Sequence, residues 1–129
     1  RALLAAEATH VSRLWLEIAE SGALKHLPEF RALCIDLKSI GCRIGLEHFG
    51  HHFSQIGQLH DLGLDFLKVD SSFVRGLDSN SGNTAFLKGL CGIAHTIGLQ
   101  VMAEGVASQG EMDTLKSAGF DGVTGPVLA

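Results

Sequence analysis

The sequence predicts an α/β protein that forms part of a TIM-like (β/α) barrel, with about five parallel strands and intervening helices. Short apolar runs alternate with longer amphipathic segments, and glycine stands at many of the joints. This rhythm is typical of βα units arranged around a parallel sheet. A complete barrel needs roughly 250 residues, whereas the chain has 129, so the sequence provides only part of one.

The strands are the short apolar runs, which we place at residues 13–18, 42–46, 66–69, 99–103 and 121–124. The helices are the longer segments with apolar residues at helical spacing, which we place at residues 2–9, 28–40, 53–62, 84–97 and 109–118. Pro28 suits the first turn of its helix and Gly41 suits the end. The 84–97 helix is expected to bury one face, which consists of Phe86, Leu87, Leu90, Ile93, Ala94 and Ile97.

Composition excludes several classes of function. A net charge of −4 provides no basic field for nucleic acid, and no apolar run reaches the roughly 20 residues that span a bilayer. Cys34, Cys42 and Cys91 match no zinc or disulfide-exchange spacing, so we expect buried, reduced thiols in a cytoplasmic protein. The chain begins without methionine inside a helical pattern, so we expect it to be a piece of a longer protein.

Polar residues follow the successive strands at their carboxyl ends. They are Glu17, Glu47, His48, Lys68, Asp70, Glu104 and Thr124. In β/α barrels these ends meet at one rim, where active sites are built. Acids and a lysine that converge on one rim would suit a divalent metal ion and a phosphate group.

Each of these residues also has a purely structural interpretation. Glu17 could be a solvated acid at a strand end, and Lys68 and Asp70 could form a structural ion pair, which is about as well supported as a functional role. Glu104 follows a buried apolar strand and precedes Gly105, a position that favours function.

Six short motifs together resemble the EAL domain family of cyclic di-GMP phosphodiesterases. They are LEIAES at 16–21, GLEHFG at 45–50, LKVDSSFV at 67–74, AHTIGL at 94–99, AEGVA at 103–107 and GFDGVTGP at 119–126. Their order and spacing agree with the family from about residue 14 to residue 125. The resemblance identifies residues 1–129 as the C-terminal part of a single EAL domain.

The resemblance implies roles for the rim residues. Family members hydrolyse cyclic di-GMP with two Mg²⁺ or Mn²⁺ ions. Glu17 and Glu47 fall at metal-ligand positions, and Lys68 and Glu104 fall at catalytic positions. The nucleotide-binding positions are Lys68, Asp70, Glu104 and Thr124.

The sequence departs from the family at three of its positions. The family's Asp-Asp pair is Glu47–His48 here, the last Glu of its AEGVE motif is Ala107, and the Gln before its Gly-Tyr is Thr124. Imidazole is a poor ligand for Mg²⁺, so we expect a degenerate site with Glu47 as a weak ligand and no bound metal. The Glu-Ala-Leu motif and a ligating Asn fall before Arg1 in the family, so this chain alone is expected to be inactive.

The histidines at 48, 51 and 52 raise the alternative of a zinc site. Adjacent side chains such as His51 and His52 do not naturally face one ion, so we favour a polar loop.

The leading functional hypothesis is a receptor that binds cyclic di-GMP without cleaving it. The HFG sequence resembles that of membrane-anchored family receptors with a companion GGDEF domain, which places this domain in the cytoplasm. The alternatives are an active metal-dependent phosphodiesterase in the full-length protein and a docking module without nucleotide. An opened barrel exposes strand edges, so we also expect a homodimer or a contact with a partner chain.

Overall fold

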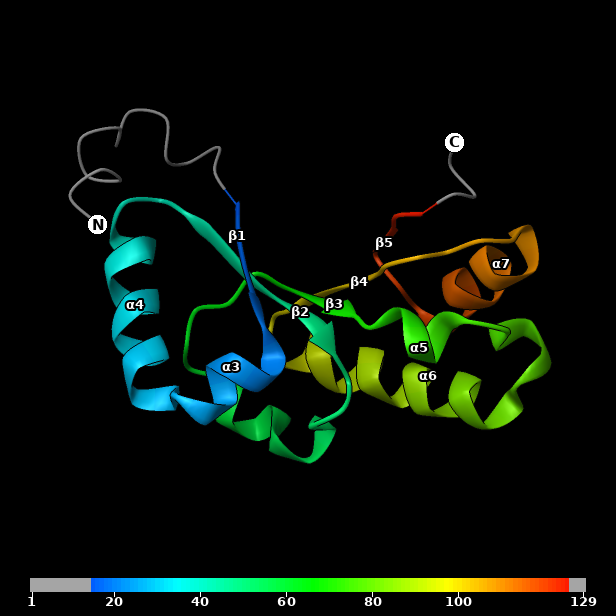
Figure 1. Cartoon of the computed structure of the whole chain (residues 1–129), viewed down its shortest axis with the longest axis horizontal. Coiled ribbons are helices and arrows are strands. Elements are labelled where there is room, and N and C mark those ends of the chain that lie inside the picture. The colour runs from blue at the N-terminus through cyan, green and yellow to red at the C-terminus, as the bar shows by residue number, and fades with distance from the viewer. Residues whose placement is uncertain (1–14, 126–129) are drawn as a thin grey trace.

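A computed structural model describes residues 15–125, and its centre is a five-stranded parallel sheet in the order β1-β2-β3-β4-β5. The strands are Trp15–Ala19 (β1), Arg43–Phe49 (β2), Phe66–Val69 (β3), Gln100–Ala103 (β4) and Gly122–Val123 (β5). Consecutive strands are neighbours, and Figure 1 shows them fanned across the molecule with helices beneath and beside them. The predicted partial barrel is therefore confirmed, as a sheet that stays open within the described residues.

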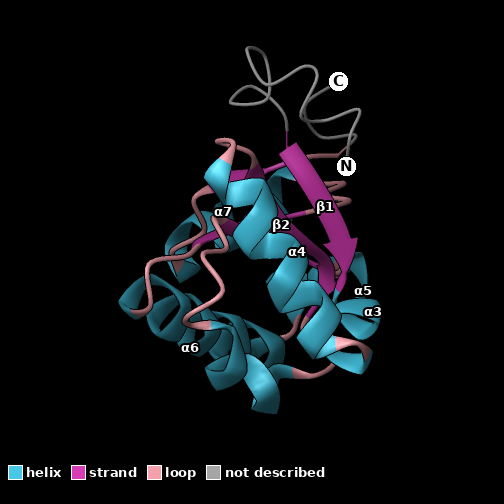
Figure 2. Ribbon diagram, turned by 90° about the vertical axis from the view of Figure 1, so that its left-hand side faces the viewer, coloured by secondary structure: helices cyan, strands magenta, loops and turns pink. Residues whose placement is uncertain are grey.

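The helices connect the strands in chain order. They are α3 (Glu20–Lys25) and α4 (Leu27–Ser39) after β1, the 3₁₀ helix η1 (Phe53–Leu59) after β2, α5 (Ser71–Val74), η2 (Leu77–Ser79) and α6 (Ser81–Thr96) after β3, and α7 (Gln109–Ala118) after β4. Figure 2 shows α4 running beside β1 and β2. The predicted helix at 2–9 lies outside the described residues.

Local geometry explains where these elements differ from the prediction. The α6 helix begins three residues before the predicted 84, because Asn80 caps it by accepting a hydrogen bond from the Asn83 backbone at 2.9 Å. The predicted helix at 53–62 is a 3₁₀ helix that ends at Leu59. The short elements α3, α5 and η2 were not predicted, since each is too short to show a helical period.

The core lies between the sheet and the helices. Fully buried strand residues such as Ile44, Leu67 and Val101 pack against Cys34 of α4 and Leu90 of α6. The prediction that Ile93 lies on the buried face of α6 was wrong, because Ile93 is 44% exposed. The buried stripe of α6 is Leu87, Leu90, Cys91 and Ala94.

Two aspartates fix the start of a neighbouring strand in the same way. Asp65 precedes β3 and accepts a hydrogen bond from the Ile44 backbone of β2 at 2.8 Å. Asp121 precedes β5 and accepts one from the Val101 backbone of β4 at 2.7 Å, while it also bonds His95 at 2.7 Å. The motif residues His95 and Asp121 therefore hold the sheet together at its amino end.

The prediction that the three cysteines are buried is confirmed, and all three thiols are free. Within residues 15–125, no helix has the length and apolar character needed to cross a membrane.

Candidate functional site

A bulge in β2 brings two consecutive side chains to the carboxyl rim of the sheet. Leu46 pairs with Leu67 and Phe49 pairs with Val69, so β2 takes three steps where β3 takes two. His48 lies in this bulge in the left-handed region, with a φ of 54°. An extra residue in one strand redirects the side chains around it, and here Glu47 and His48 both reach the rim. The predicted strand ended at residue 46, so the bulge was not expected.

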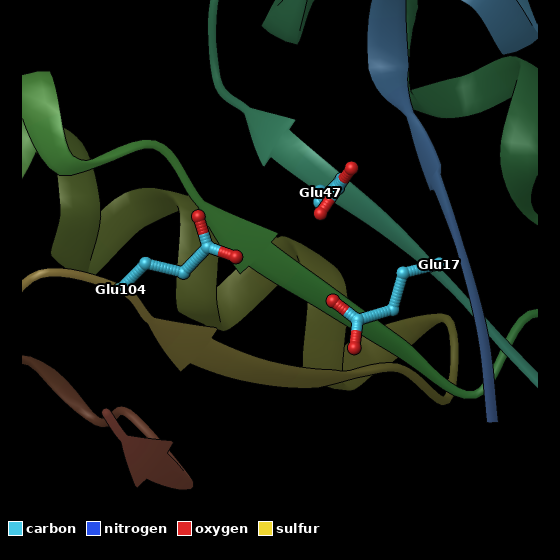
Figure 3. Close-up of side chains that lie close together, drawn as sticks. All are labelled: Glu17, Glu47 and Glu104. Carbon is cyan, nitrogen blue, oxygen red and sulfur yellow. The ribbon is translucent and has the colours of Figure 1, made fainter. Parts of the chain in front are cut away.

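Three glutamates converge at this rim. Glu17 comes from β1, Glu47 from β2 and Glu104 from the residue after β4, and each offers an oxygen within 4.8 Å of the others. Figure 3 shows the three side chains turned toward one another over β3. All three are partly buried. Three carboxylates at this spacing suit one divalent cation, because hard cations prefer anionic oxygen ligands.

Lys68 lies beside the glutamates on β3. Its Nζ contacts both carboxylate oxygens of Glu17, at 2.8 and 2.9 Å, and its side chain is only 17% exposed. The alternative of a Lys68–Asp70 ion pair was wrong. Asp70 lies past the end of β3, where the chain turns into α5, so the two-residue alternation of the strand no longer places it beside Lys68.

Burial is the main reason that the pKa of Glu104 is raised, and the like charges of Glu47 and Glu17 add to the effect. His48 and Lys68 act in the opposite direction. Burial therefore disfavours the charged form of Glu104, and a bound cation would favour it.

Asp70 is paired with histidines. His51 Nε2 lies 2.6 Å from one of its oxygens and His48 Nδ1 lies 3.4 Å from the other. The Ser72 hydroxyl donates to the first oxygen at 3.0 Å. These hydrogen bonds, chiefly that of His51, lower the pKa of Asp70.

Thr124 and Ala107 lie at the side of the site formed by β4 and β5. The Thr124 hydroxyl makes a long contact of 3.5 Å to the Ala103 carbonyl, and its own carbonyl accepts a 3.0 Å hydrogen bond from Val106. Ala107 is exposed and contributes only a methyl group. Thr124 therefore engages the backbone of the adjoining strand and loop.

Sequence reasoning missed Glu20, the first residue of α3. Its carboxylate is 1% exposed and accepts hydrogen bonds from Gly50 N at 3.3 Å, and from His52 N and His52 Nδ1 at 3.2 Å each. It therefore holds the loop that follows Glu47 and His48. The signal was present, since Glu20 is the second acid of the LEIAES motif, but the motif alone assigned it no role.

Sequence reasoning also missed Glu111 on α7. This buried carboxylate accepts hydrogen bonds from Ala107 N at 2.9 Å and Gly76 N at 3.0 Å, which lower its pKa. It ties the loop after β4, which carries Glu104, to the loop after α5. A signal was present, since Ser108 and Glu111 form the Ser-x-x-Glu pattern of a helix start, and Ser108 Oγ accepts a hydrogen bond from Glu111 N at 3.1 Å.

The residues present fit one hard cation and not two. Glu17, Glu47 and Glu104 could share one ion. A second Mg²⁺ or Mn²⁺ beside it would need further oxygen ligands, but His48 contributes imidazole nitrogen and Asp70 is bonded by His48, His51 and Ser72.

A parallel β/α sheet with acids and a lysine at its carboxyl rim defines the class as a β/α-barrel domain, in which this rim is where binding sites are built. The model of the EAL domain family matches residues 1–129, and the chain belongs to this family. The family resemblance found in the motifs is thereby confirmed.

The similarity to two curated relatives extends over most of the chain. The chain is 29% identical over 126 residues to the cyclic di-GMP phosphodiesterase PdeF of Escherichia coli, which covers 98% of this chain and 17% of PdeF. A protein of Sinorhizobium fredii, y4lL, is 31% identical over 114 residues, with 88% of this chain and 14% of y4lL covered. The chain thus spans a small part of these relatives.

Solved structures share the fold. The EAL domain of Xanthomonas citri FimX in complex with c-diGMP is 30% identical with a TM-score of 0.85, and covers 95% of this chain and 48% of its own. The PaMucR phosphodiesterase in complex with c-di-GMP is 26% identical with a TM-score of 0.87. The match covers 98% of this chain and 51% of the PaMucR chain. BlrP1 of Klebsiella pneumoniae, solved with manganese and cyclic di-GMP, shares the fold at 24% identity and a TM-score of 0.81. The match covers 89% of this chain and 29% of the BlrP1 chain.

Proposed function

We propose that residues 1–129 are the C-terminal part of a single EAL domain, which binds cyclic di-GMP as a receptor and does not hydrolyse it. The extent of the match supports the proposal that the chain is only part of an EAL domain, because it covers about half of the solved FimX domain (48%) and of PaMucR (51%). The open sheet of the described residues agrees with this, since a closed barrel would need further strands.

The replacement of the family's Asp-Asp pair by Glu47–His48 carries the proposal of lost hydrolysis. His48 presents an imidazole to Asp70 and Glu104, at 3.4 and 3.9 Å. A pair of neighbouring Mg²⁺ or Mn²⁺ ions needs dense anionic oxygen. One ion among Glu17, Glu47 and Glu104 would leave the second position without its bridging carboxylate.

Retention of Lys68, Asp70 and Glu104 supports nucleotide binding. Lys68 is the cation of the rim, and its ammonium group is held between β1 and β3 by Glu17. A phosphate oxygen could share this ammonium group, because its three donors are not limited to one partner. Thr124, at the far side of the rim, would contribute a hydroxyl group in place of the family's amide.

Calorimetry with cyclic di-GMP, together with chromatography of the products in Mg²⁺ or Mn²⁺, tests the proposal on the complete polypeptide that contains this chain. We expect micromolar binding and no linear dinucleotide. Lys68→Met should weaken binding by at least about tenfold, since a hydrogen bond to a charged group contributes roughly 1.5–3 kcal/mol. The matched control is Lys116→Met on the exposed side of α7, which should bind as the unaltered protein does.

Two alternatives correspond to the other outcomes. Measurable cleavage would show an active phosphodiesterase, an alternative that the spacing of Glu17, Glu47 and Glu104 favours, because they can still share one cation. No binding at micromolar nucleotide would leave only the protein-docking module among the three hypotheses. Either result contradicts the receptor proposal.

The two edge strands of the sheet, β1 and β5, also bear on the partners of this chain. Within the described residues, β1 pairs only with β2 and β5 only with β4. Unpaired strand edges attract further strands, so the chain on its own would pair with a second copy or with a partner chain. Light scattering on the 129-residue chain checks this, and a monodisperse monomer would contradict it. In the parent protein, a GGDEF domain and an inner-membrane anchor would place this domain in the cytoplasm.

A further inference from the structure

Two adjacent histidines in the loop after β2 face carboxylates from two different elements. His51 Nε2 lies 2.6 Å from Oδ2 of Asp70, which precedes α5. His52 Nδ1 lies 3.2 Å from Oε1 of Glu20, which begins α3. The histidines of this region do not converge on one metal ion, because within the described residues three ligand atoms lie close together only in the glutamate cluster of the rim. They connect the loop to two acids instead.

We propose that His51 and His52 position this loop through contacts that depend on protonation, so that the loop is held more firmly at pH 6 than at pH 8. Imidazole is the side chain whose charge ordinarily changes between pH 5 and 8. An imidazolium adds the attraction between opposite charges to its hydrogen bond with a carboxylate. When the proton is lost, only the hydrogen bond of a neutral ring remains at each acid.

The exposure of the two pairs suits such contacts. The side chains of His51 and His52 are 50% and 43% exposed, so both rings can exchange protons with the solvent. The carboxylates that they face are more enclosed, at 20% exposure for Asp70 and 1% for Glu20. A change of charge on either ring therefore acts on an acid that the structure holds in place.

The surroundings of the first pair leave His51 as the main partner of Asp70. From α5, the Ser72 hydroxyl donates to Asp70 at 3.0 Å, and the uncharged ring of Phe73 lies 5.0 Å from that of His51. From the bulge of β2, His48 Nδ1 lies 3.4 Å from the other oxygen and is a second titratable group at this acid. The pKa of Asp70 is lowered, chiefly by its hydrogen bond with His51, so this acid stays charged while imidazole titrates.

The second pair is built into the backbone of the loop. Glu20 also accepts hydrogen bonds from Gly50 N at 3.3 Å and from His52 N at 3.2 Å. The ring of His52 therefore shares its acid with two amides of the same loop. When the ring gains charge, the attraction draws the loop toward Glu20, and the two amides report the change.

The position of this loop bears on the rim, because the loop directly follows Glu47 and His48 and its His51 holds Asp70. Here the inference rests on the proposed receptor function, in which Asp70 is one of the nucleotide-binding residues. A loop that is already held loses less freedom when a ligand binds. Cyclic di-GMP should therefore bind more tightly at pH 6 than at pH 8.

Hydrogen exchange without nucleotide tests the contacts separately from the receptor function. The complete polypeptide is exchanged at pH 6 and at pH 8, and the rates of the Gly50 and His52 amides, both of which donate to Glu20, are compared with their intrinsic rates at each pH. We expect the protection of these amides to fall about two- to fivefold between pH 6 and pH 8, the effect of losing an ion pair whose members are partly exposed.

The matched variants remove the charge and keep a hydrogen-bond donor. His51→Gln and His52→Asn each retain a side-chain amide of similar reach, so the double variant should show no change of protection with pH. His60→Gln is the control, since this exposed ring contacts only the Gly57 carbonyl among the contacts found for it, at 2.9 Å, and the full pH dependence should remain. It should also remain in His48→Asn, because asparagine tolerates the φ of 54° at that position.

Circular dichroism verifies the fold of each variant, and calorimetry with cyclic di-GMP at both pH values measures the effect on the rim. We expect about two- to fivefold tighter binding at pH 6 in the unaltered protein and equal binding at both pH values in the double variant. Equal protection of the loop at pH 6 and pH 8, or the same change in the double variant, would overturn the proposal. Protection that changes with pH while nucleotide affinity does not would overturn its link to the rim. Protection that changes in a protein that binds no cyclic di-GMP would support the contacts and contradict the receptor function.

Discussion

The carboxylate of Glu20 accepts two hydrogen bonds from His52, one from the backbone nitrogen and one from Nδ1, each 3.2 Å long. Glu20 follows β1 directly, whereas His52 lies in the loop after β2. A third bond, from Gly50 N, completes the set. One buried acid therefore fixes the loop that carries His51 and follows Glu47 and His48.

Replacing Glu20 by alanine should loosen this loop and destabilise the fold. Leaving a buried donor without a partner costs about 1–3 kcal/mol, so we expect a loss of roughly that size in the free energy of unfolding. Hydrogen exchange of the Gly50 and His52 amides should become faster, while that of the α6 core stays slow. Glu29→Ala, at an exposed position on α4, is the control. Unchanged exchange at Gly50 and His52 would show that Glu20 does not hold the loop.

Much of the sheet could be predicted from the sequence because the strands of a buried parallel sheet are short and nearly continuous apolar runs. Residues 66–69 were placed at their observed bounds. The bulge in β2 could not be predicted, since it is a difference in register against β3 that neither strand shows alone. For the same reason the sequence ended this strand at Leu46 and treated His48 as part of a loop.

The convergence of the acids was predictable, but their partners were not. Strand-end positions alone bring Glu17 and Glu104 to one rim. The pairing of Lys68 with Glu17 across β2 depends on side-chain reach and direction, which strand order does not specify. The contacts of Glu20 and Glu111 are mostly to backbone groups of other segments, and a sequence pattern does not specify which backbone groups a side chain reaches.

Gly45 is required because the Phe66 ring of the adjacent strand lies against its Cα. The two residues are register partners, and a Cβ at position 45 would overlap the ring. Overpacking of this kind costs about 1–3 kcal/mol, so Gly45→Ala should lower the urea midpoint accordingly. Phe66→Leu in the same chain should restore part of the loss. Gly57→Ala, where no atom lies within 4 Å of the added methyl, should have no comparable effect, and equal midpoints for the two alanine variants would refute this account.

The three thiols should react with disulfide reagents only when the protein unfolds. Burial raises the pKa of Cys34 from 9.0 to about 11 and that of Cys91 to about 12, and it raises the pKa of Cys42 as well. Two pKa units for Cys34 mean about 100-fold less of the reactive thiolate. With Ellman's reagent at pH 8 we expect slow modification of the native protein and rapid modification of all three thiols in urea. Rapid native modification of any of them would disagree with the burial.

The raised pKa of Glu104 implies that its charge opposes folding. Below the unfolded-state pKa of about 4.3, the carboxyl is protonated in both states and this cost is absent. As pH rises through the folded-state pKa, the native state must ionise a buried acid and stability is lost. Glu104→Gln should therefore stabilise the metal-free protein more at pH 7 than at pH 4, as measured by urea unfolding with a chelator present. A variant that is destabilised equally at both pH values would contradict this sign.

Placing aspartates at the β2 bulge should raise the affinity of the rim for Mn²⁺. Aspartate tolerates the left-handed backbone that His48 adopts at a φ of 54°, so Glu47→Asp combined with His48→Asp should fold. The double variant regains a hard oxygen ligand beside Glu104 and loses the imidazole that faces Asp70. We expect Mn²⁺ affinity to rise by at least about tenfold, because the rim gains an anionic oxygen ligand of the kind that hard cations prefer. Calorimetry with Mn²⁺ measures the change. If Mn²⁺ affinity stayed unchanged, the missing carboxylate would not be what separates this rim from a two-metal site.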